Sequence, residues 1–266
     1  MSRIKTTFEQ LKKTQTKAFI PFIMAGDGGL ENTLLLMQTL VENGADILEL
    51  GVAFSDPMAD GPVISRAHQR AVEAGVSLAT VLELVQKFRQ NDDKTPVLLM
   101  GYLNPIEVFG YQKFADKASS SGVDGVLVVD MPPEESEDLK QNLDAVSIDF
   151  IFLIAPTTTD NRIALLSKIA SGFVYFVALK GVTGAANLDV DLVKRNLKCI
   201  HQHIDLPVGV GFGIQDSASA KRVSEYADAV IVGSALVIIV EKYLLDKTKM
   251  LATVGALAAE ISEAIK

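Results

Sequence analysis

The sequence predicts an α/β fold, a single (βα)8 TIM barrel in which eight parallel strands alternate with helices. Three observations favour it: a length of 266 residues, eight short apolar runs, and longer amphipathic stretches between them. A strand with a right-handed helical crossover, used eight times in about 250 residues, closes most economically into a barrel. An open, doubly wound parallel sheet is the alternative.

The apolar runs and the amphipathic stretches give the expected elements in order. Strands are expected at residues 19–24, 46–50, 96–100, 125–129, 148–153, 173–177, 207–211 and 229–232. Crossover helices are expected at residues 30–43, 78–90, 111–121, 161–170 and 190–203. We expect two extra helices, at residues 6–13 before the first strand and at 249–265 after the barrel closes. The chain has no low-complexity linker or charge block, so residues 1–266 are expected to form one domain.

Composition and charge exclude several classes of function. The chain has 25 basic and 33 acidic residues, a net charge of −8, and so lacks the positive field that nucleic-acid binding needs. Its single cysteine, Cys199, excludes an intrachain disulfide and agrees with a reducing, cytoplasmic location. No signal peptide is expected. The apolar run at residues 229–240 is shorter than the ~20 residues of a spanning helix, so no membrane partner is expected either.

Glu49 is the first candidate for chemistry. In the strand at residues 46–50, side-chain alternation sends Leu48 and Leu50 toward the helices and Glu49 into the barrel. A carboxyl near the end of a buried strand loses its water, and this raises its pKa toward the range of a general acid. The alternative is a structural glutamate that is hydrogen-bonded to neighbouring strands.

Asp60 lies in the loop that follows this strand. The loop, residues 51–62, also contains Asp56 among small and turn-forming residues. Active sites of barrel enzymes lie at the carboxyl ends of the strands, which makes polar residues here informative. Asp60 precedes Gly61 and Pro62 and could simply begin a turn. Beside Glu49, it is a candidate partner in dividing acid and base roles.

Three glycine-rich segments in the last third of the chain point to a phosphate. They are Gly181-Val-Thr-Gly184, Gly209-Val-Gly-Phe-Gly213 and Gly233-Ser234, the last opening a helix. Barrel enzymes commonly bind phosphate in these loops, through backbone N–H groups and a helix N-terminus. The alternative is that the glycines only serve tight turns.

Three long motifs carry a family resemblance. The run from Glu49 to Pro62, the run Gly181-Val-Thr-Gly-Ala185 and the run Gly211-Phe-Gly-Ile214 closely resemble the α subunit of tryptophan synthase, and the match covers nearly the whole chain. The resemblance implies retro-aldol cleavage of indole-3-glycerol phosphate to indole and glyceraldehyde 3-phosphate, in L-tryptophan biosynthesis. It implies no metal or organic cofactor on this chain. The implied partner is the β subunit, which carries pyridoxal phosphate, in an α2β2 heterotetramer.

The resemblance also implies roles for individual residues. Glu49 would protonate indole C3 and help to take the glycerol hydroxyl proton, and Asp60 would stabilise charge at the indole N–H. Thr183 would lie in a loop that closes over the substrate and positions Asp60. The other implied substrate contacts are Phe22, Leu127 and Phe212 at the indole, Tyr175 near Glu49, and Gly184, Gly213, Gly233 and Ser234 at the phosphate.

Further positions at the same end of the barrel have implied supporting roles. Asp130, at the end of the fourth strand, would have a polar supporting role rather than a chemical one. Asn104-Pro105 and the loops around residue 56 and at residues 131–135 would meet the β subunit.

Other polar residues are interpreted as structural. Cys199 and His203 share one face of a predicted helix, but His201 points about 160° away from them, so ligation of a metal by all three is not expected. His68 follows the Asp60 loop and is expected to be a solvated or capping histidine; the alternative is a base.

Two rival functions stay open. One is another phosphate-binding barrel enzyme of the tryptophan pathway, which explains the glycine loops but not Glu49 together with Asp60. The other is a non-catalytic subunit that only activates its β partner. That role predicts damaged catalytic positions, whereas Glu49 and Asp60 are intact.

Overall fold

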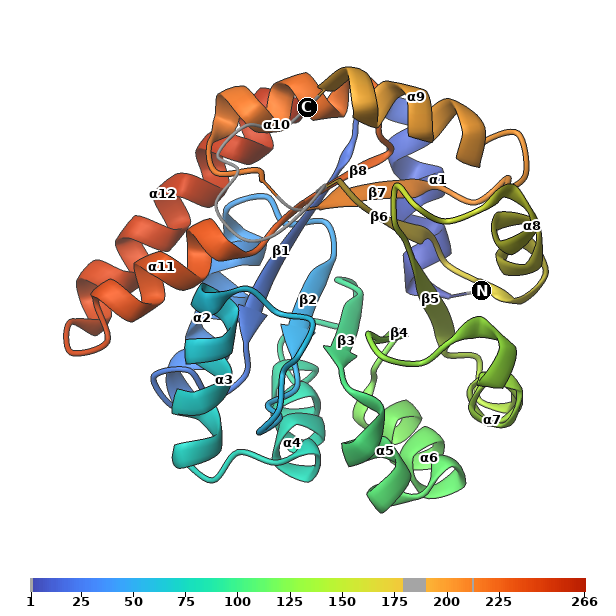
Figure 1. Ribbon diagram of the computed structural model, residues 1–266. Coiled ribbons are helices and arrows are strands. Elements are labelled where there is room, and N and C mark those ends of the chain that lie inside the picture. Colours follow the sequence, from blue (N-terminus) through green and yellow to red (C-terminus); the bar gives the residue numbers. More distant parts are fainter. Residues whose placement is uncertain (1, 179–189, 212) are drawn as a thin grey trace.

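The eight strands close into one parallel barrel (Figure 1). The structure is a computed structural model that describes residues 2–178, 190–211 and 213–266. Each strand pairs in parallel with the next, and β8 returns to β1. The predicted barrel is confirmed, and the open sheet is wrong. The strands are β1 (Ala18–Met24), β2 (Leu48–Gly51), β3 (Val97–Gly101), β4 (Gly125–Val128), β5 (Asp149–Ile154), β6 (Val174–Val177), β7 (Val208–Gly211) and β8 (Ala229–Val232).

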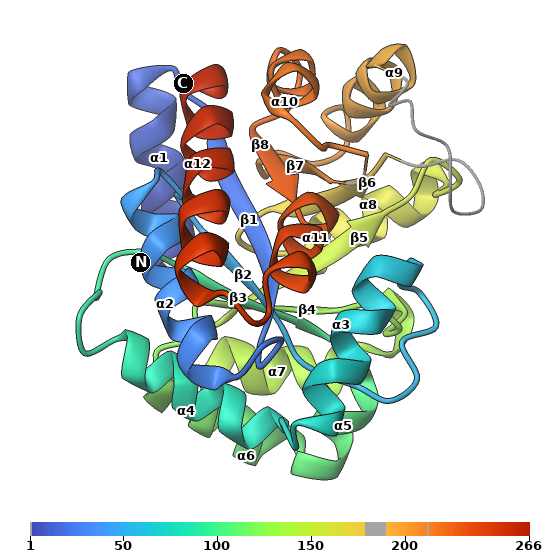
Figure 2. The ribbon, with the colours of Figure 1, turned by 90° about the vertical axis from the view of Figure 1, so that its left-hand side faces the viewer.

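Helices surround the strands on the outside. Figure 2 shows α12 running beside α2 and α11 on the barrel's outer surface. The helices are α1 (Arg3–Thr14), α2 (Leu30–Glu42), α3 (Pro62–Glu73), α4 (Leu78–Phe88), α5 (Leu103–Phe109), α6 (Tyr111–Ser121), α7 (Glu137–Ala145), α8 (Asp160–Ile169), α9 (Val190–Ile200), α10 (Ser217–Ser224), α11 (Ser234–Lys242) and α12 (Lys247–Ile265), with a 3-10 turn at Pro133–Glu135. The two expected extra helices, α1 and α12, are confirmed. No helix in the described part of the chain is long and apolar enough to cross a membrane.

Sequence reasoning did not single out α7 and α10, nor α3 and α5, which follow β2 and β3. The buried residues of helix α3 are Ala67, His68 and Ala71, none of which is a large apolar side chain. Helix α5 has seven residues, which is shorter than the window in which a helical period can be recognised. Both helices follow strands at the carboxyl end of the barrel, so the omission matters for the site.

The core has two main apolar layers, one between strands and helices and one inside the barrel, and a smaller cluster that contains Phe22. Leu48 and Leu50 belong to the outer layer, while Ile47 belongs to the inner one, as strand alternation predicts. Helix α1 adds Ile4 and Phe8 to the inner layer and covers the amino end of the strands. The other buried residues of the inner layer are Ala18, Ile20, Leu98, Leu127, Ile151, Phe173, Tyr175, Ala229 and Ile231.

Asp124 attaches α1 to the amino end of the barrel. It lies just before β4 and is 5% exposed. Its carboxylate accepts hydrogen bonds from Arg3 Nη1 at 2.8 Å, Arg89 Nη2 at 2.6 Å and the Val97 backbone N–H at 2.8 Å. Three donors on one buried carboxylate offset the cost of removing its charge from water.

Replacing Asp124→Asn should therefore lower the free energy of unfolding by about 3 kcal/mol, because Arg89 would stay buried without its charged partner. The midpoint of urea unfolding measures this effect. The matched control is Glu134→Gln, which removes the carboxylate of an exposed ion pair with Arg162 and should cost at most about 1 kcal/mol. Equal losses in the two variants would contradict a specific role for Asp124.

Candidate active site

Glu49 extends into the barrel from β2, as alternation predicts. It is 1% exposed, and its Oε1 has no hydrogen-bond partner among the residues that the structure describes. That oxygen argues against a structural glutamate tied to neighbouring strands. Burial raises the pKa of Glu49 from its usual 4.5 to about 8, and the charge of Asp60 contributes in the same direction. The carboxyl is therefore mostly in its acid form at neutral pH.

Asp60 is held from outside the barrel by two side chains. The Tyr102 hydroxyl donates to Asp60 Oδ2 at 2.7 Å, and His68 Nε2 lies 3.2 Å from the same oxygen. The Asp60 backbone N–H also donates to Pro57 O at 3.1 Å, so this residue lies in a turn as well. Both interpretations of Asp60, as a turn residue and as a carboxylate beside Glu49, agree with the geometry.

The prediction for His68 is wrong. His68 is 3% exposed and contacts Asp60, whereas a solvated or capping histidine was expected. The reason is tertiary: the loop after β2 folds back over α3, so that residue 60 meets a side chain in the middle of the helix. No sequence pattern around residue 68 indicates that this loop packs over the helix.

Tyr102 was also missed by sequence reasoning. It directly follows β3, at the end of the barrel where polar residues are informative, and this position was the available signal. Asp130 fixes the chain next to Tyr102: the Asp130 carboxylate accepts the Leu103 backbone N–H at 2.8 Å, at the start of α5. The polar supporting role expected for Asp130 therefore has a structural counterpart.

Tyr175 lies near Glu49 inside the barrel. It is 5% exposed, and burial raises the pKa of its hydroxyl well above the usual value, with the charges of Glu49 and Asp60 adding to the effect. Its ring occupies space that a glycine leaves: a Cβ on Gly211 would lie 2.1 Å from the tyrosine Oη. The structure therefore brings Tyr175 to the same end of the barrel as the two carboxyl groups.

Phe22 connects the Glu49 region with the β8–α11 turn. It pairs in register with Glu49 across β1 and β2. Its ring lies 3.4 Å from the Cβ position of Gly233, so this predicted indole contact also touches the predicted phosphate loop. Leu127, on β4, is fully buried in the inner layer together with Tyr175.

The predicted phosphate residues are described only in part. Gly213 has a φ of 78°, a conformation that favours glycine. Gly233 is the N-cap of α11, and in the described chain no side chain caps that terminus, which leaves backbone N–H groups available to an anion. Ser234 is the first residue of the helix. Thr183, Gly184 and Phe212 lie outside the described residues.

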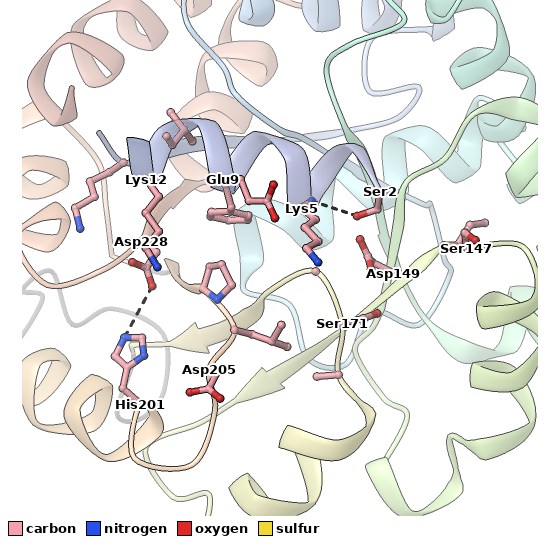
Figure 3. A pocket seen from close by; sticks show the side chains of 18 of the residues that line it. Ser2, Lys5, Glu9, Lys12, Ser147, Asp149, Ser171, His201, Asp205 and Asp228 are labelled. Carbon is pink, nitrogen blue, oxygen red and sulfur yellow. Dashed lines mark hydrogen bonds and ion pairs between the residues drawn. The ribbon is translucent and has the colours of Figure 1, made fainter. Parts of the chain in front are cut away.

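A cavity of about 980 Å³ lies at the opposite end of the barrel (Figure 3). Figure 3 shows Lys5 and Lys12 of α1 on one side of it, and Asp149, Asp205 and Asp228 on the other. These residues lie at the amino ends of the strands, whereas barrel enzymes carry out their chemistry at the carboxyl ends. We therefore keep this cavity apart from the candidate active site.

The residues of the suspected metal cluster separate as expected. Cys199 and His203 lie together, while His201 Nε2 lies 3.9 Å from Asp228. Asp160 of α8 joins the first two, but the Cys199 thiol donates to its carboxylate at 3.4 Å. Burial and Asp160 raise the pKa of this thiol, which disfavours the thiolate that a metal ion requires. We assign no metal to this group.

Comparisons with known proteins agree with one another. Residues 8–266 match the family model of the tryptophan synthase alpha chain. The alpha chain of Vesicomyosocius okutanii subsp. Calyptogena okutanii (strain HA) is 66% identical over 266 residues, which cover 100% of both chains.

Solved structures show the same fold. The tryptophan synthase subunit alpha of Legionella pneumophila str. Paris has a TM-score of 0.92 and 42% identity, covering 100% of this chain and 98% of that one. A chain of the tryptophan synthase complex from Pyrococcus furiosus has a TM-score of 0.82 and 32% identity, covering 92% of this chain and 98% of that one. With the family model matching almost the full length, this chain belongs to the tryptophan synthase alpha chain family.

Proposed function

We propose that this chain cleaves indole-3-glycerol phosphate to indole and glyceraldehyde 3-phosphate, with Glu49 as the acid and base and Asp60 as the group that stabilises the indole N–H. Membership of the alpha chain family supports the reaction. The observation that carries the assignment of Glu49 is its buried carboxyl, whose pKa is raised to about 8, at the end of the barrel near Asp60. The second half of the barrel supplies the phosphate loops.

One carboxyl can serve both proton transfers of this reaction. In its acid form, Glu49 donates a proton to indole C3, which converts the ring into a cationic indolenine. The resulting desolvated carboxylate is a strong base and takes the proton from the glycerol hydroxyl. The carbon–carbon bond then breaks, its electron pair returns to the ring, and indole and the aldehyde form. Glu49 ends the cycle protonated, as it began.

Asp60 has a different task, because its environment is different. Its carboxylate accepts the Tyr102 hydroxyl and faces His68, so it is held in place by donors. A fixed carboxylate near the indole N–H favours the positive charge that develops on the ring. Phe22, Leu127, Tyr175 and Phe212 would enclose the indole, and Thr183 would position Asp60 as its loop closes.

The phosphate would bind at the other side of the mouth of the barrel. The uncapped N-terminus of α11 offers backbone N–H groups at Gly233 and Ser234. Gly184 and Gly213 would complete the cradle. The Phe22 ring lies against Gly233, so the indole and phosphate subsites would share one wall.

The partner would be the β subunit of tryptophan synthase, in an α2β2 assembly. The Pyrococcus furiosus relative was solved as a tryptophan synthase complex. Two large apolar side chains lie exposed in or near segments that we expect at that interface: Met58, 84% exposed in the loop after β2, and Val108, 82% exposed on α5 three residues after Pro105. Single exposed apolar side chains are common on protein surfaces, so the support comes from the place of these two at the expected interface and not from their exposure alone.

The proposed steps are proton transfers and a carbon–carbon cleavage whose electron pair returns to the indole ring, so we propose that this chain uses no metal or organic cofactor and that pyridoxal phosphate belongs to the β partner. A cytoplasmic location is part of the proposal. The free thiol of Cys199, the single cysteine, agrees with a reducing compartment.

The purified chain should release indole from indole-3-glycerol phosphate, and adding a tryptophan synthase β subunit should increase the rate. Glu49→Gln should lower the rate by about 10²–10⁴-fold, because the amide can neither donate nor take up the proton. Indole release is followed by chromatography, and binding of glycerol 3-phosphate by calorimetry. The variant should bind glycerol 3-phosphate as the wild type does.

The controls separate the rival functions. Absence of indole release with and without the β subunit, together with activation of the partner, would favour a non-catalytic activating subunit. Unchanged turnover in Glu49→Gln would remove Glu49 from the mechanism.

The raised pKa of Glu49 should also make stability depend on pH. Between pH 4.5 and about 8, the folded chain keeps a proton on Glu49 that the unfolded chain has lost. The free energy of unfolding should therefore fall as pH rises through this window, by about 1.4 kcal/mol per pH unit from this group, and level off above about 8. Glu49→Gln lacks this contribution. Urea unfolding of both proteins from pH 5 to 9 measures the difference, and parallel curves would contradict it.

A further inference from the structure

The hydrogen bonds of His68 define its protonation state. Its Nδ1 accepts the backbone N–H of Phe54 at 3.0 Å, so Nδ1 carries no proton. Neutral imidazole then has its proton on Nε2, which lies 3.2 Å from Asp60 Oδ2 and donates to it. Neither ring nitrogen is free to take a proton from a substrate. His68 is therefore not a second base.

Both side-chain donors reach the same oxygen of Asp60. Tyr102 Oη and His68 Nε2 contact Oδ2, and in the described residues no bond reaches Oδ1. Two donors on one oxygen fix the plane of the carboxylate, because rotating it would exchange the bonded oxygen for the free one. The other oxygen keeps its lone pairs for a further donor.

His68 itself lies in a rigid setting. Its ring meets the Tyr102 ring edge-on, with centroids 5.9 Å apart, and the Phe54 ring stacks on Tyr102 at 5.2 Å. Two residues further along α3, Arg70 makes two hydrogen bonds to the buried Asp27 carboxylate, at 2.6 and 2.8 Å. The helix is thus tied to the loop after β1, and a side chain on it can hold a partner in a defined place.

We propose that His68 is a positioning residue for Asp60: the neutral Nε2–H form, locked by the Phe54 N–H, holds Oδ2 with Tyr102 so that Oδ1 accepts the indole N–H. This inference rests on the proposed function of the site. His68 acts only through Asp60, and its contribution appears when charge develops on the indole ring. It should therefore affect kcat more than KM.

Two substitutions separate the two hydrogen bonds of the ring. His68→Asn keeps an acceptor near the position of Nδ1 for the Phe54 N–H but is too short to reach Asp60. His68→Gln places an amide donor near the position of Nε2. We expect His68→Asn to lower kcat by about 10- to 100-fold, the effect of one hydrogen bond to a charged group, with little change in KM. His68→Gln should recover most of that loss.

The matched control is His201→Asn, which changes a histidine whose side chain is 42% exposed at the far end of the barrel and should leave kcat unchanged. Urea unfolding of all variants identifies any that are merely unstable. Equal loss in the Asn and Gln variants, or no loss in either, would overturn the proposal.

A direct spectroscopic test does not depend on activity. The chain has three histidines, so ¹⁵N NMR of the imidazoles can be assigned with the His68 and His201 variants. We expect His68 to be neutral, with the proton on Nε2, at pH 7.5. A proton on Nδ1 would overturn the proposal even if the enzyme is active. If the wild-type chain releases no indole, the proposed function fails, and the NMR result still tests whether His68 has the tautomer that donation to Asp60 requires.

Discussion

The removal of Glu49 from water is the constraint on which the rest of the site depends. A carboxyl that is 1% exposed, with one oxygen lacking a partner in the described structure, is costly to ionise. Burial therefore keeps Glu49 protonated at neutral pH, and the carboxylate that forms when this proton leaves is a strong base. The same burial lowers the stability of the fold at alkaline pH. Activity and instability have one physical cause here, which is typical of functional sites.

The barrel makes this arrangement possible by supporting its two carboxyl groups from opposite directions. Glu49 reaches inward from β2 into an apolar lumen, whereas Asp60 is held by His68 of α3 and by Tyr102, which directly follows β3. Glycines then admit the aromatic rings: Gly211 leaves space for Tyr175. Two carboxyl groups in such different surroundings can take different roles in one reaction.

The closed barrel and the inward direction of Glu49 can be predicted from the sequence, because both depend on local periodicity. Alternation in β2 sends Glu49 inward, and repeated strand and helix patterns predict the closed barrel. The contacts of His68 do not follow, because they depend on the loop after β2 returning over α3, which is a tertiary event. The contact between Asp160 and Cys199 does not follow from sequence either. Asp160 belongs to the neighbouring helix α8, and no residue spacing within α9 indicates the contact.

The most direct test of the account is the pKa of Glu49 itself. Glutamate labelled with ¹³C at the side-chain carboxyl gives one signal per residue, and comparison with Glu49→Gln assigns the signal of interest. We predict that this signal titrates with a midpoint of about 8 in the free chain. A midpoint near the ordinary value of 4.5 would show that the carboxyl is solvated and ionised at neutral pH, and would contradict its role as the proton donor.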